Sequence, residues 1–162
     1  MSAVKKVLVP TDFSEASKAA LRYACDLATA TNASLCVLHA VESPYSAGLP
    51  EHCTMPHEYL KQLERSARRE LEKLLDEVLT PEESKQFRVS LVLRTGGAAR
   101  EILRYLQEHP NVDLVVMATH GRGGVRRLMM GSIADKIVRA ANCPVLTMRL
   151  PNVESTKTGK AA

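Results

Sequence analysis

Glycines, arginines and a hydroxyl gather in one stretch of the chain, ATHGRGGVRRLMMGS at residues 118–132. Glycines let a backbone approach a phosphate closely, and the free N–H groups at the start of a helix attract anions. Gly131 and Ser132 stand where an apolar helical pattern begins, so we expect their N–H groups and hydroxyl to point outward. The stretch therefore predicts a phosphate-binding loop, with charge from Arg122 and a pliable backbone from Gly121, Gly123 and Gly124.

Asp12 is a second candidate, because it stands two residues beyond the predicted strand VKKVLVP at residues 4–10, in the loop that follows it. Its carboxylate can accept hydrogen bonds from a ribose hydroxyl or reach a metal ion that bridges phosphates. It can equally form an Asx turn ahead of Ser14, which is placed to cap the next helix. Both interpretations stay open on spacing alone.

The histidines and cysteines give no strong indication of a catalytic or metal-binding site. His120 lies in the glycine-rich stretch and could act as a base, but packing or hydrogen bonding within the loop is the favoured interpretation. His52, Cys53 and His57 do not have the spacing of a common zinc site, so we expect no metal there. The four cysteines form no C-x-x-C pair, which predicts reduced thiols, mostly in the core.

The elements that position these residues follow from the apolar pattern. Five apolar runs, at residues 4–10, 34–41, 87–94, 112–118 and 144–150, alternate with helical patterns at 14–31, 60–78, 96–109 and 131–141. Such alternation predicts an α/β fold: a single doubly wound, Rossmann-like, five-stranded parallel sheet with helices on both faces. The common strand order for five strands is 3-2-1-4-5.

In that order the chain reverses direction across the sheet between the first and fourth strands, where ligands bind in such folds. The loops PTDFS, at residues 10–14, and ATHGRGG, at residues 118–124, both meet at this switch point. A P-loop and a dinucleotide fingerprint are excluded, because G-x-x-x-x-G-K-[ST] is absent and the first strand–helix turn carries no glycine.

Bulk properties limit the class of protein further. The 162 residues predict one domain over residues 1–150, followed by a disordered tail over 151–162. No apolar run approaches the roughly 20 residues of a membrane span and no signal peptide stands out, so we expect a soluble, cytoplasmic protein. The net charge of +4 is too mild to predict nucleic acid as a partner.

Two blocks of the chain resemble the universal stress protein family, in its nucleotide-binding branch. They are KKVLVPTDFSEASKAALRYA at residues 5–24 and DLVVMATHGRGGVRRLMMGSIADKIVRAANCPVLTMR at residues 113–149. The resemblance implies binding of ATP or AMP, and homodimers that pair through the last strand, here Pro144 to Leu150. The family motif G-x-x-G-(nine residues)-G-[ST] then falls on Gly121, Gly131 and Ser132, with Ala118 in place of its first glycine.

The same resemblance assigns roles to further residues. It implies that Pro10, Thr11 and Asp12 line the adenosine end, that the backbone of Ala40 faces adenine, and that Met117 contacts the base or ribose. Arg122 and the N–H of Ile133 would face the phosphates. If Ala118 needs a positive φ, alanine costs on the order of 1 kcal/mol relative to glycine; at negative φ its methyl is accommodated.

The function predicted from this resemblance is a stress-response regulator that binds ATP or AMP and acts through conformation, dimerisation and an unidentified protein partner. Mg²⁺ would be an optional companion of ATP. Two alternatives stay open: a nucleotide-free dimeric scaffold of the same family, or a weak ATPase assisted by His120 or Asp12. No dedicated catalytic constellation is visible, so at most slow hydrolysis of ATP is expected.

Overall fold

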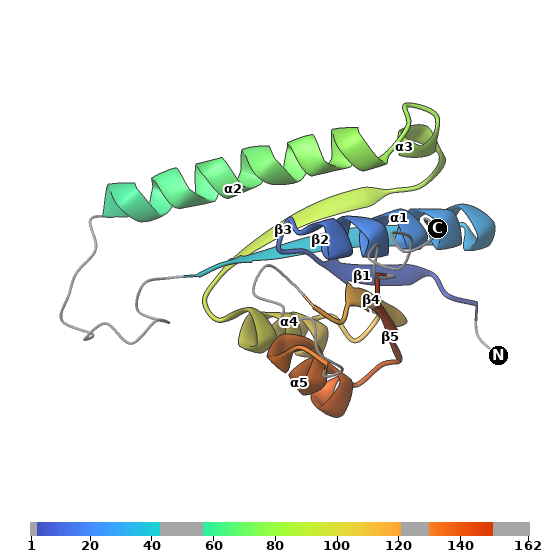
Figure 1. Ribbon diagram of the computed structural model, residues 1–162. Helices are drawn as coiled ribbons and strands as arrows, with labels where there is room; N and C mark the ends of the chain where they lie inside the picture. Colours follow the sequence, from blue (N-terminus) through green and yellow to red (C-terminus); the bar gives the residue numbers. More distant parts are fainter. Residues whose placement is uncertain (1–2, 43–56, 121–129, 151–162) are drawn as a thin grey trace, which may run out of the picture.

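A computed structural model describes residues 3–42, 57–120 and 130–150 of the chain (Figure 1). Five parallel strands form one sheet in the order β3-β2-β1-β4-β5, which confirms the predicted fold class. The strands are β1 (Lys6–Pro10), β2 (Ser34–Val41), β3 (Val89–Thr95), β4 (Leu114–Ala118) and β5 (Val145–Met148). The last strand is thus shorter than the predicted 144–150.

In the described ranges five helices accompany the sheet: α1 (Glu15–Thr31), α2 (His57–Val78), α3 (Glu83–Gln86), α4 (Ala98–Glu108) and α5 (Ser132–Ala140). Figure 1 shows α2 on one side of the sheet and α4 and α5 on the other. The four-residue helix α3 was not predicted, since so short a segment has no apolar period. Helix α2 begins three residues before the predicted position 60.

The core consists of two layers, because alternate residues of each strand point to opposite faces. On one face Val7, Val9 and Val37 pack with apolar side chains of α1 and α2. On the other face Leu8, Leu38 and Val115 pack with those of α4 and α5. Strand β4 is buried on both faces, as predicted for a central parallel strand.

Local signals explain where helix α1 starts and stops. Ser14 is its N-cap, and the Ser14 hydroxyl accepts a hydrogen bond from the N–H of Ser17 at 3.2 Å. Asn32 ends the helix in the left-handed conformation with a φ of 55°. The predicted cap of α1 is therefore confirmed, and the loop before it has a defined end.

Two of the predicted core thiols are fully buried, Cys25 and Cys36, while Cys143 is half-buried, and all three are free. Burial raises the pKa of Cys25 to about 12, so this thiol stays protonated at neutral pH. Within the described ranges, no helix is long and apolar enough to cross a membrane.

Several predicted features lie outside the described residues. These are the segment 43–56 with His52 and Cys53, the segment 121–129 with Gly121 and Arg122, and the tail 151–162. The loop after β1, the strand ends and the start of α5 are described in full.

Candidate functional site

The site begins with Thr11, which is buried directly after β1. Its N–H donates to the carbonyl of Leu38 at 2.9 Å, which continues the pairing of β1 with β2. Its hydroxyl lies 3.0 Å from the hydroxyl of Ser17 and accepts the N–H of Phe13 at 3.1 Å. Thr11 thus connects β1, β2 and α1, and its backbone is held in one place.

Asp12 forms the Asx turn that the sequence allowed. One carboxylate oxygen, Oδ1, accepts the N–H of Ser14 at 3.1 Å and the hydroxyl of Ser14 at 2.6 Å. The local interpretation of Asp12 is therefore confirmed. It does not displace the ligand interpretation, because an ionised carboxylate has about four acceptor positions. The turn instead orients the carboxylate, and the ribose role stays a prediction.

Phe13 and His39 complete this loop. Phe13 has a φ of +64°, which is unusual for a residue with a bulky side chain. Its ring lies 4.3 Å from the ring of His39, centroid to centroid. The Nδ1 of His39 donates to the carbonyl of Thr11 at 2.8 Å. The sequence analysis missed His39, although a polar residue near the end of a buried strand was a usable signal.

Gly131 joins the end of β4 to the start of α5. Its N–H donates to the carbonyl of Thr119 at 2.8 Å, and a Cβ at this position would lie 2.7 Å from that same carbonyl oxygen. Only glycine therefore fits without movement of the backbone. Gly131 is the N-cap of α5 and offers no side-chain cap to the first-turn N–H groups. The predicted start of this helix is confirmed.

The predicted site residues divide into buried and exposed sets. Pro10, Thr11, Ala40 and Met117 are buried, Asp12, Ala118 and Gly131 are half-buried, and Ser132 and Ile133 are exposed. Because all strands are parallel, the carboxyl ends of β1, β2 and β4 lie at the same end of the sheet. The start of α5 is tied to that end through Gly131 and Thr119.

The sheet is paired unevenly at this end. The ladder between β1 and β2 continues to Pro10 opposite Leu38, whereas the ladder between β1 and β4 ends at Leu8 opposite Val115. The two central strands therefore stop pairing before their carboxyl ends. This is the position at which the strand order reverses and at which the sequence predicted a ligand.

Ala118, the departure from the family motif, is the last residue of β4 and pairs with Met148 of β5. The non-glycine residues with positive φ in the described ranges are Phe13 and Asn32, so Ala118 has a negative φ. Alanine consequently imposes no left-handed strain here, while accommodation of its methyl beside a nucleotide stays a prediction.

His120 lies beside this junction. Its Nδ1 is 2.9 Å from the hydroxyl of Thr119, and its buried Nε2 has no hydrogen-bond partner within the described part of the chain. The contact with Thr119 agrees with the interpretation that His120 hydrogen-bonds within the loop. For metals, the described residues contain no group of three or more His, Cys, Asp or Glu side chains that could hold an ion.

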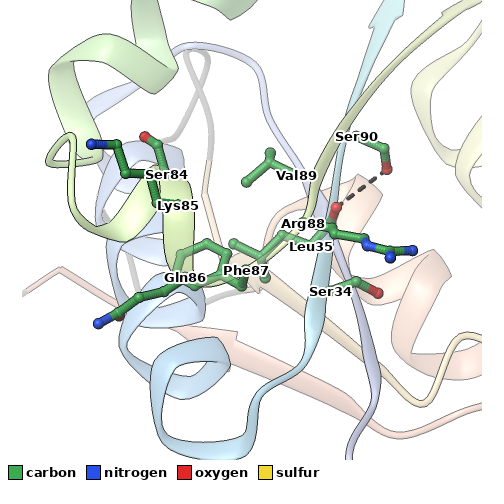
Figure 2. A pocket seen from close by; sticks show the side chains of 9 residues that line it. All are labelled: Ser34, Leu35, Ser84, Lys85, Gln86, Phe87, Arg88, Val89 and Ser90. Carbon is green, nitrogen blue, oxygen red and sulfur yellow. Dashed lines mark hydrogen bonds between the residues drawn. The ribbon is translucent and has the colours of Figure 1, made fainter.

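A depression of about 740 Å³ lies at the amino ends of β2 and β3, away from the carboxyl ends that form the candidate site (Figure 2). It is lined at the starts of β2 and β3 and by α3, and Lys85 and Arg88 are among its residues. The hydroxyls there are already used: Ser34, Ser84 and Ser90 donate to the carbonyls of Lys5, Thr80 and Leu35. Exposed cations and occupied hydroxyls do not make a built ligand site.

The five-stranded parallel sheet in the order 3-2-1-4-5, with helices on both faces, defines a Rossmann-like α/β protein. The sequence model of the universal stress protein family matches residues 3–149. The chain belongs to the universal stress protein family.

Known relatives are similar to this protein in sequence or in fold over most of the chain. The universal stress protein MJ0531 of Methanocaldococcus jannaschii is 29% identical over 152 residues, which are 93% of this chain and 85% of the relative. The solved structure of the hypothetical protein MJ0577 is similar in fold, with a TM-score of 0.77 and 24% identity over 93% of this chain and 99% of that one.

Two further solved structures contain nucleotides. A universal stress protein in complex with cAMP has a TM-score of 0.65 at 20% identity. The matched region is 91% of this chain and 98% of that protein. The universal stress protein of Archaeoglobus fulgidus in complex with dAMP has a TM-score of 0.59 at 18% identity. The matched region is 90% of this chain and 98% of that protein.

Proposed function

We propose that this protein is a stress-response regulator that binds ATP or AMP at the carboxyl edge of its sheet. One observation carries the proposal: the N-terminus of α5, with no side-chain cap, is fixed by Gly131 to the end of β4. The cAMP and dAMP complexes of related proteins support an adenine nucleotide as the ligand. The expected cytoplasmic location belongs to the same proposal and is tested by fractionating cells.

The residues present fit such a ligand. A phosphate is held by N–H groups at a helix start, and α5 offers those of Ser132 and Ile133 together with the exposed Ser132 hydroxyl. Asp12 presents an oriented carboxylate to a ribose hydroxyl. Pro10, Thr11, Ala40 and Met117 lie at the same edge and line the adenosine end. Gly121 and Arg122 would complete the phosphate contacts from outside the described residues.

Regulation would follow from a difference in affinity between two conformations, since a ligand shifts an equilibrium only by binding its two states unequally. In this proposal the nucleotide favours one placement of the residue 121–131 segment relative to the start of α5. A protein partner then reads the altered surface. Mg²⁺ would accompany ATP by bridging its phosphates.

The proposal includes a homodimer formed through the outer edge of β5. Every residue of β5 is half-buried in the single chain, so this edge strand is incompletely covered. Val138 on the neighbouring helix α5 and Leu150 beyond the strand are exposed apolar residues. A second copy pairing along β5 would cover them, as expected for an edge strand that must be protected.

Calorimetric titration with ATP and with AMP, each with and without Mg²⁺, tests the ligand. We expect dissociation constants in the micromolar range, which correspond to a binding free energy of about −8 kcal/mol, because the start of α5 carries no side-chain cap and Ala118 adds no strain. GTP serves as the control for adenine preference. An absence of heat and of thermal stabilisation at millimolar nucleotide would contradict the proposal and favour a nucleotide-free dimeric scaffold.

Slow hydrolysis is a separate question. A weak ATPase would show ADP release at saturating ATP that falls in a His120→Ala or Asp12→Ala variant whose ATP affinity is retained. Unchanged turnover in both variants would exclude these two side chains from hydrolysis.

A further inference from the structure

We propose that His39 is a positioning residue that sets the place of the Asp12 carboxylate in the nucleotide site. The inference rests on the proposed function and adds a residue that lies on a different strand from the β1 loop. His39 is half-buried on β2, next to the predicted adenine contact Ala40. Nothing in the local sequence of either segment connects the two.

His39 contacts both neighbours of Asp12. Its Nδ1 donates to the carbonyl of Thr11 at 2.8 Å, immediately before Asp12. Its ring lies against the ring of Phe13, immediately after Asp12, with centroids 4.3 Å apart and planes inclined by 42°. The backbone of Asp12 is therefore held between two residues that one imidazole fixes. The Asx turn to Ser14 then directs the carboxylate.

The loop needs such support because Phe13 adopts a φ of +64°. A bulky L-residue reaches this conformation only when surrounding contacts over-determine it, and such residues cluster at functional sites. The N–H of Phe13 donates to the Thr11 hydroxyl at 3.1 Å, its side chain packs against the core cluster that contains Val9 and Leu21, and its ring meets His39. Loss of the His39 side chain would remove one donor from the Thr11 carbonyl and one neighbour from the Phe13 ring, so the Asp12 backbone between them would be held less tightly.

Three variants separate the hydrogen bond of His39 to Thr11 from its ring contact with Phe13. In His39→Asn the side-chain amide nitrogen takes the place of Nδ1 and keeps the donor to Thr11. In His39→Phe the ring is kept and the donor is lost, and His39→Ala removes both. We expect ATP affinity to fall about tenfold in His39→Ala, with substantial recovery in His39→Asn. A matched control, Cys36→Ala, removes a buried thiol from the opposite face of the same strand, in the cluster packed on α4 and α5, and should leave affinity unchanged.

A double-mutant cycle with Asp12→Ala tests whether His39 acts through Asp12. If it does, His39→Ala lowers ATP affinity in the wild-type background and has no further effect in the Asp12→Ala background. Equal losses in both backgrounds would overturn the proposal, since His39 would then act on the ligand or on the whole fold. Equal losses of ATP affinity in His39→Ala and Cys36→Ala would overturn it as well.

Hydrogen exchange without nucleotide distinguishes failure of this inference from failure of the proposed function. The amides of Phe13 and Ser14 are hydrogen-bonded within the loop, so we expect them to exchange faster in His39→Ala and near wild-type rates in His39→Asn. Unchanged exchange in His39→Ala would overturn the positioning role even in a protein that binds ATP. If wild-type protein fails to bind ATP or AMP, the proposed function fails and this role in nucleotide binding fails with it, whatever the exchange rates show.

Discussion

At the scale of single residues, two glycines occupy the same capping position and differ only in what surrounds them. Gly97 is the N-cap of α4 and Gly131 is the N-cap of α5, with φ values of −68° and −60° that any residue can adopt. A Cβ on Gly97 would meet nothing within 4 Å, whereas one on Gly131 would lie 2.7 Å from the Thr119 carbonyl. The requirement for glycine at position 131 is thus steric, not conformational.

This comparison predicts different outcomes for the same substitution. Gly131→Ala should destabilise the fold by about 1–3 kcal/mol, because the clash is with backbone and strains the junction of β4 and α5. Gly97→Ala should change stability by no more than about 0.5 kcal/mol. Chemical denaturation of both variants measures the difference. Since capping and chain-entropy effects are shared, equal stabilities would refute the steric explanation.

At the scale of elements, one arginine attaches the unpredicted helix α3 to α1. Arg22 of α1 donates to the Val78 carbonyl at 2.8 Å, at the end of α2, and forms an ion pair with Glu83 of α3. Glu83 also accepts the N–H of Thr80 at 2.8 Å. The Arg22 guanidinium, followed by the Thr80 N–H, lowers the pKa of Glu83 from 4.5 to about 2.

A lowered pKa in the folded state predicts how stability depends on pH. The contribution of the ionised Glu83 is fully present above its ordinary pKa of 4.5 and is lost as the pH falls through about 2. Glu83→Gln should therefore lower the melting temperature at pH 7, and its difference from wild type should shrink between pH 4.5 and 2. The neighbouring Glu82→Gln is the control, because Glu82 is exposed and makes no side-chain cap. A difference that is constant with pH would show that Arg22 does not act through the Glu83 charge.

At the scale of the whole molecule, the edge strand β5 has backbone groups on its outer side that do not face β4. The sheet ends at β3 on one side and at β5 on the other. The carbonyl of Pro144, just before β5, accepts the N–H of Val115 of β4, and the carbonyl of Met148 of β5 accepts the N–H of Thr119, just after β4. Because alternate residues of a strand point their backbone groups to opposite sides, the N–H of Thr147 faces the outer edge.

The proposed dimer can therefore be tested without disturbing the sheet. Thr147→Pro removes an outward N–H and should weaken dimerisation at least tenfold, while the ladder to β4 is retained. Thr147→Val keeps the N–H and should leave the dimer intact. Sedimentation velocity over a range of concentrations measures both. A dimer of unchanged strength in Thr147→Pro would show that pairing does not use the β5 edge.

The local sequence determined a large part of this protein. Apolar runs alternating with helical periods were sufficient for five strands and their parallel arrangement, because burial on both faces leaves few other solutions. The order 3-2-1-4-5 was predicted as the common one for five such strands. Ser14 and Asp12 were readable as a cap and a turn, since each acts within three residues of itself. The glycine and hydroxyl at 131 and 132 marked the start of α5 for the same reason.

Tertiary structure alone decided which distant side chains meet. His39 reaches a carbonyl 28 positions away in the chain, and Arg22 pairs with a residue 61 positions away. Gly131 needs the absence of a Cβ because the end of β4 approaches it, which no helical or strand period encodes. Periodicity reports the face on which a residue lies, whereas contacts across the fold depend on how the layers pack, and that packing exists only once the chain has folded.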